Sequence, residues 1–149
     1  MCLFDVFLDH CRHGDMAGVQ RGACKLHPRW LQLGFRNACA GGHLHVAQWL
    51  VQQGGVSLLD CAVNTAFWWA CAGGHLHVAM WLFHHGHVAV HKDHDMAFLD
   101  ACRNGHVHVA RWLLCLDAGY EAWPPRGLRC LKVWSPLRDA WMRAVANTR

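Results

Sequence analysis

The sequence predicts an all-α solenoid of helix hairpins, with short β-turn fingers between the hairpins and a capping helix at the C-terminal end. One pattern recurs, reading F-R-N-A-C-A-G-G-H-L-H-V-A-Q-W-L from Phe35, F-W-W-A-C-A-G-G-H-L-H-V-A-M-W-L from Phe67 and F-L-D-A-C-R-N-G-H-V-H-V-A-R-W-L from Phe98. A divergent copy starts at Phe7. The four phenylalanines are 28, 32 and 31 residues apart, a period typical of stacked repeats rather than of one globular core.

Each full copy is predicted to form two antiparallel helices joined by a tight turn. The segment before the turn is short and apolar, and the segment after it, as from Leu76 to Leu82, has apolar residues at helical spacing. A glycine pair or Asn-Gly lies between them, which suits backbone with a positive φ.

Glycines also follow the second helices, at Gly54, Gly86 and Gly119, where a left-handed residue would end each helix. The stretches 55–64 and 87–95 are then long enough to form extended fingers. The link from Arg21 to Leu33 is expected to be irregular.

These motifs resemble the ankyrin repeat, whose consensus contains T-P-L-H, A-A and G-H. In the central copy, residues 65–68 fall on T-P-L-H, Ala70-Cys71 on A-A and Gly74-His75 on G-H. The likeness is strong in G-H-[LV]-H-V-A-x-W-L, weak in the first tetrad, and covers about residues 5–120. The degenerate repeats are similar to ankyrin arrays of large DNA viruses of protists.

The resemblance divides the chain into five parts. We expect a degenerate N-terminal capping repeat (1–30), three ankyrin-like repeats (31–62, 63–93 and 94–120) and a basic C-terminal tail that contains the capping helix (121–149).

Composition and cysteine positions bear on the compartment. Hydrophobic residues are 54% of the 149 residues and charged residues 16%, and neither a secretory signal nor a membrane span is visible. Four of the nine cysteines share one repeat position: Cys11, Cys39, Cys71 and Cys102. Packed helices lie about 8–10 Å apart, too far for a disulfide, so we expect free, buried thiols and an intracellular protein, cytoplasmic or nuclear. The viral likeness leaves a host cell open as the setting.

The recurring histidines and tryptophans are predicted to be structural. His43, His75 and His106 follow the turn glycine, where the family's histidine ties the loop. His45, His77 and His108 should form an exposed row, with a pH sensor as the alternative to a plain solvated face. Trp49, Trp81 and Trp112 should form a packing layer between repeats, and Trp69 is placed in the core. The 14 histidines are candidate metal ligands, but no C-x2-C pair occurs and no metal is predicted.

The resemblance implies a non-enzymatic, monomeric scaffold that binds a partner protein through the concave surface of fingers and first helices. No catalytic or phosphate-binding motif occurs, so no cofactor or small-molecule substrate is predicted. The candidate contact residues are Arg36, Trp68 and Leu99 on the first helices. On one finger they are His91, Lys92, Asp93 and His94.

The tail carries the whole net charge of +4. Residues 1–119 hold eight basic and eight acidic residues, whereas the last thirty hold six and two. Two alternative functions follow for the tail. Its W-P-P-x-G-L-x-C-L run loosely echoes motifs that recruit ubiquitin ligases, and its charge would suit nucleic acid or an anionic membrane. Nucleic acid is not the favoured partner.

The tail also generates a stability prediction. From Ser135 onward, apolar residues at helical spacing, Leu137 to Val145, would cover the exposed end of the last hairpin, because a repeat buries its face only against a neighbour. Truncation after Gly119 should therefore lower the melting temperature and cause aggregation, as measured by thermal denaturation and light scattering. An unchanged, monomeric truncated protein would show that the helix is not a cap.

Overall fold

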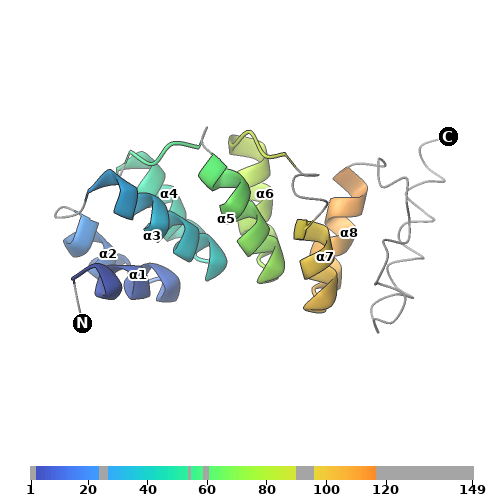
Figure 1. Ribbon diagram of the computed structural model, residues 1–149, viewed down its shortest axis with the longest axis horizontal. Helices are drawn as coiled ribbons and strands as arrows, with labels where there is room; N and C mark the ends of the chain where they lie inside the picture. The colour runs from blue at the N-terminus through green and yellow to red at the C-terminus, as the bar shows by residue number, and fades with distance from the viewer. Residues whose placement is uncertain (1–2, 24–26, 54, 59–60, 90–95, 117–149) are drawn as a thin grey trace.

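The computed structural model describes residues 3–23, 27–53, 55–58, 61–89 and 96–116. Within these residues the chain forms α-helices in four antiparallel pairs, and no strand (Figure 1). The helices are α1 (Leu3–His13), α2 (Met16–Ala23), α3 (Pro28–Ala40), α4 (Leu44–Gln52), α5 (Cys61–Ala72), α6 (Leu76–His85), α7 (Met96–Arg103) and α8 (Val107–Leu116). The all-helical repeat fold is confirmed, whereas the extended fingers stay a prediction.

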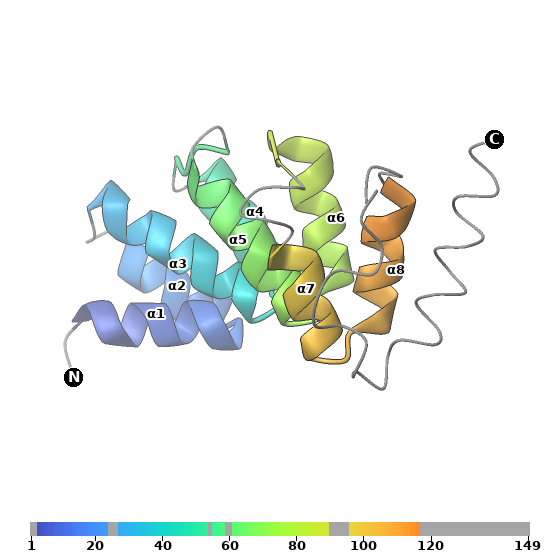
Figure 2. The same cartoon turned by 45° about the vertical axis from the view of Figure 1, so that its right-hand side comes forward.

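The pairs stack in a row with α1 and α8 at opposite ends. Each first helix (α1, α3, α5 and α7) packs against its own second helix, and neighbouring first helices pack against one another, α1 on α3, α3 on α5 and α5 on α7. Figure 2 shows the first helices as one layer and the second helices as the other. The row therefore presents a long face of first helices along its whole length.

The core is a ladder of identical residues from successive repeats. The phenylalanines Phe7, Phe35, Phe67 and Phe98 are at most 2% exposed. The predicted cysteine ladder lies beside them, buried and free. Burial raises the pKa of the Cys11, Cys71 and Cys102 thiols to about 12 and raises that of Cys39 as well, so these thiols are protonated and unreactive at neutral pH.

The turns have the predicted left-handed backbone. Gly14, Gly42, Gly74 and Gly105 have φ values of 77°, 79°, 79° and 80°. Only glycine adopts this region without strain, which accounts for its place in every repeat.

The prediction of a left-handed cap at Gly86 is wrong. Gly86 is extended, with φ −113° and ψ 157°. Glycine is needed there for space, since a Cβ would lie 2.8 Å from Val63 Cγ1 and 2.9 Å from the Leu82 oxygen. Gly54 and Gly119 lie outside the described residues.

Two linkers are more helical than expected. Helix α5 begins at Cys61, so the second part of the expected finger 55–64 is helix. Helix α3 begins at Pro28, inside the link expected to be irregular, with proline at a position that suits it. His27 Nδ1 accepts a hydrogen bond from the Arg29 backbone N–H at 3.3 Å. The finger residues 91–94 and the tail 121–149 with its capping helix lie outside the described residues.

The recurring tryptophans lie at the edge of the core rather than within it. Trp49, Trp81 and Trp112 are half-buried and pack against the core residues. Trp81 also stacks on His85, with ring centroids 5.4 Å apart. No described helix is long and apolar enough to cross a membrane.

The core ladder predicts where damage is worst. Phe67→Ala should lower the free energy of unfolding by about 3–5 kcal/mol, because the phenyl ring is fully enclosed. Trp81→Ala should cost less, since part of the indole remains in solvent. Urea denaturation of the two variants measures both costs, and a larger loss for Trp81→Ala would contradict this packing order.

Candidate interaction surface

The predicted row of exposed histidines forms hydrogen bonds between repeats. The Nε2 atoms of His45, His77 and His108 lie 3.2, 2.9 and 2.9 Å from the carbonyl oxygens of Gly14, Gly42 and Gly74. A carbonyl oxygen only accepts, so Nε2 carries the hydrogen and donates it. Each of these histidines thus ties its repeat to the turn of the preceding one.

The other histidine of each pair covers the same turn glycine. The ring of His43 lies against Gly14, that of His75 against Gly42 and that of His106 against Gly74, and a Cβ on any of these glycines would overlap the ring. Both histidines contact an earlier turn. They are therefore structural.

The first repeat lacks both histidines. It has Asp15 and Ala17 at the equivalent positions. Asp15 caps α2 instead, accepting the Gly18 N–H at 3.2 Å. In the part of the chain that the structure describes, no three His, Cys, Asp or Glu gather to hold a metal ion.

The open surface lies along the first helices, in a groove between α3 and α5 made of two hollows that share Arg36. The larger hollow, of about 350 Å³, is near the turns and draws residues from all four repeats. The smaller, of about 190 Å³, lies farther from the turns. The first is lined by Arg12, Arg36, Asn37, Ala40, Trp69, Ala72, Gly73 and Asn104, and the second by Arg29, Gln32, Leu33, Arg36, Ala62 and Thr65. We call these residues the first-helix groove.

Helical periodicity places these residues on one face of each helix. On α3 the lining residues include Arg29, Leu33, Arg36 and Ala40, and on α5 they recur with the same three-to-four-residue steps from Ala62 to Ala72. Two neighbouring first helices therefore contribute one continuous wall each.

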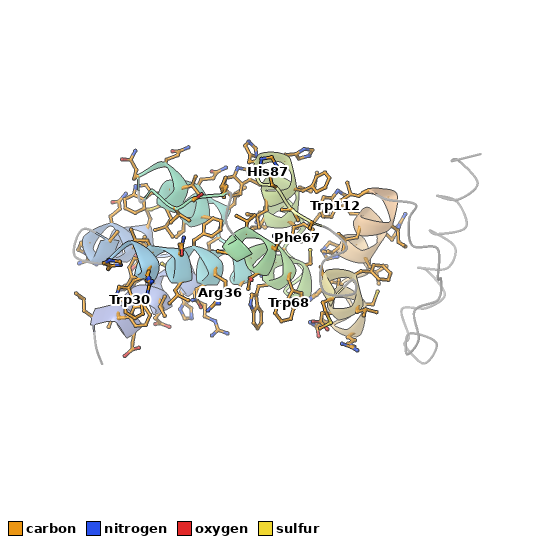
Figure 3. The ribbon with its side chains drawn as sticks, turned by 45° about the horizontal axis from the view of Figure 1, so that its top comes forward. Trp30, Arg36, Phe67, Trp68, His87 and Trp112 are labelled. Carbon is orange, nitrogen blue, oxygen red and sulfur yellow. The ribbon has the colours of Figure 1, made fainter. Side chains whose placement is uncertain are left out.

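The structure places the predicted contact residues in different surroundings. Arg36 lines both hollows of the groove. Leu99 is half-buried against the core. Trp68 is also half-buried, and its Nε1 donates a hydrogen bond to Asp100 Oδ2 at 2.8 Å, joining α5 to α7. Figure 3 shows Arg36 and Trp68 on their neighbouring first helices. His91, Lys92, Asp93 and His94 lie outside the described residues.

The placement of Trp69 in the core is wrong. Trp69 is 43% exposed and lines the larger hollow, tilted against the Trp68 ring with centroids 4.9 Å apart. The sequence contained a signal for this. At the same repeat position the other copies have Asp9, Asn37 and Asp100, and polar residues in three of four copies indicate a solvent-facing position. Comparing the copies, rather than the family pattern, would have found it.

Stacked helix pairs with glycine turns define the protein as a helical-repeat solenoid. The family model described as ankyrin repeats (3 copies) matches residues 35–122, and the chain belongs to the ankyrin-repeat family. No curated protein and no solved structure matches it. Ankyrin repeats are generally non-enzymatic protein–protein interaction modules, so a protein partner is implied.

The half-buried His75 of the middle turn predicts a pH dependence of stability. Burial lowers the pKa of His75, a hydrogen bond to the Ala40 backbone opposes the shift, and the charges of His77, His106 and His43 lower the pKa further. The unfolded chain, with an ordinary histidine pKa of about 6.5, then binds more protons than the folded one. The resulting stability is fully present above about pH 6.5 and is lost as the pH falls through the lowered pKa of the folded state.

Urea denaturation of the wild type and of His75→Gln at pH 7.5 and 5.0 tests this. The wild type should lose more stability on acidification than the variant. Equal losses would show that His75 does not set the dependence.

Proposed function

We propose that this chain binds a partner protein, without catalysis, along the first-helix groove. The observation that carries the proposal is the contrast between repeated and variable positions. Core and turn positions carry the same residues from repeat to repeat, whereas the first-helix positions change, from Arg36 to Trp68 to Leu99 and from Asn37 to Trp69 to Asp100. Positions whose residue changes from repeat to repeat, such as Arg36 and Trp69 in the groove, are the ones able to specify a partner.

The contacts made by the histidines at the turns also favour the first-helix groove as the binding surface. The histidines along that edge are engaged with the preceding repeats, so they are poorly placed to bind a partner without weakening the array. The groove instead offers an exposed indole at Trp69 and a guanidinium at Arg36. Tryptophan and arginine are the side chains most enriched among residues that dominate binding energy.

In this proposal the chain binds its partner as a monomer inside the cell. Leu99 and the finger residues 91–94 are further candidate contact residues. Since the tail lies outside the described residues, its predicted alternatives, ubiquitin-ligase recruitment and binding of nucleic acid or an anionic membrane, add no second function here.

A photocrosslinking pair tests the proposal. Benzoylphenylalanine placed at position 69 in the groove should capture a partner protein from the cell of origin. The same group at position 80 is the matched control, because Met80 is also exposed, at 38%, but belongs to second helix α6. Mass spectrometry identifies the captured chain. Equal capture at both positions, or capture at position 80 alone, would overturn the assignment of the binding face.

A further inference from the structure

The first-helix groove carries charge of one sign. Its charged side chains are all arginines, with Arg12 and Arg36 lining the larger hollow and Arg29 and Arg36 the smaller. Helices α3 and α5, which form its walls, contain no acidic residue. Within the described part of the chain, the Arg12 and Arg36 guanidinium groups have no hydrogen-bond or ion-pair partner.

The acidic residue of the adjacent helix α7 is already engaged. Asp100 accepts the Trp68 N–H at 2.8 Å and pairs with Arg103 at 3.0 Å, and its side chain is only 19% exposed. It does not line either hollow. On α1, which supplies Arg12, Asp9 lies 3.3 Å from His13 and lines neither hollow. Because no acidic side chain lines either hollow, the groove lining is positively charged.

We propose that the first-helix groove binds an acidic, extended segment of the partner protein, with carboxylates on Arg36 and Arg12 and an apolar side chain on Trp69. The inference rests on the proposed function and specifies the chemistry of the partner. Guanidinium groups bind carboxylates through two parallel hydrogen bonds. An exposed indole beside them accepts an aliphatic or aromatic side chain.

The length of the groove suits a short segment. From Arg29 to Ala40 the α3 wall rises about 16 Å, at about 1.5 Å per residue. An extended chain advances about 3.3 Å per residue, so about five residues span it. This is the size of a linear motif rather than of a folded domain.

The charge of the whole array favours a peptide over a nucleic acid. Residues 1–119 hold eight basic and eight acidic residues, so the array as a whole does not provide the broad positive field that attracts polyphosphates. Three of the eight basic residues, Arg12, Arg29 and Arg36, line the groove without an acidic residue among them, and a few carboxylates match that charge.

A displayed library of random seven-residue peptides tests the inference, using the full-length chain as bait. The selected peptides should be enriched in Asp and Glu with an intervening apolar residue. A labelled, selected peptide should bind Arg36→Glu about tenfold to a hundredfold more weakly, and binding to the wild type should weaken as salt is raised. Arg111→Glu is the matched control, because it makes the same charge change on an exposed residue of second helix α8, and it should bind as the wild type does. Thermal melts of each variant establish that it is folded.

The outcomes separate this inference from the proposed function. If the selected peptides are neutral and their binding requires Trp69, the inference of an acidic partner is wrong, but the proposal of binding in the groove still holds. If no peptide is selected and position 69 captures no protein, both fail. A labelled single-stranded oligonucleotide that binds as tightly as the selected peptide and is equally sensitive to Arg36→Glu would overturn the inference in favour of a nucleic-acid partner.

Discussion

Each hairpin encloses its phenylalanine only because a neighbouring hairpin lies against it. Phe67 of α5 is covered with the help of α3 and α7, the helices that pack on either side, and none of the hairpins is wide enough to bury this ring alone. The spacing between repeats is therefore constrained by side-chain volume. Small residues such as Ala70 and Cys71, buried beside the ring, let the first helices approach closely enough to close that layer.

The turns depend on the same stacking. A left-handed glycine such as Gly42 places its carbonyl group where the next repeat can reach it. The His75 ring of that repeat covers the glycine, and His77 donates a hydrogen bond to its oxygen. Neighbouring repeats are thus held at the turns as well as in the core. The turns and the core hold the array together. The residues on the outer face of the first helices differ from repeat to repeat.

The same distinction decides how much the sequence alone could predict. Helix pairs, turn glycines and the buried Cys ladder follow from patterns that every repeat shares, so they were predicted correctly. Gly86 was not, because its glycine is required by the approach of Val63, a contact between residues distant in the sequence. Trp69 was misplaced because the family pattern has a core residue there, whereas Asn37 and Asp100 at the same position of other copies indicate a solvent-facing side chain. Arg12 was missed since only stacking brings α1 to the groove.

The positive charge of the groove also depends on the stacking of the repeats. Asp100 would be the natural counterion for a first-helix surface, but the adjacent repeat uses it, because Trp68 reaches across from α5 and donates to the carboxylate, while Arg103 pairs with its other oxygen. The half-buried acid of α7 is thus engaged by a hydrogen bond between repeats and by Arg103, and it does not line the groove. At the same time it holds the Trp68 ring against which Trp69 leans. The same contact therefore affects both the packing between repeats and the charge presented to a partner. A substitution of Asp100 would alter the contact between α5 and α7 and also the charge of the first-helix surface.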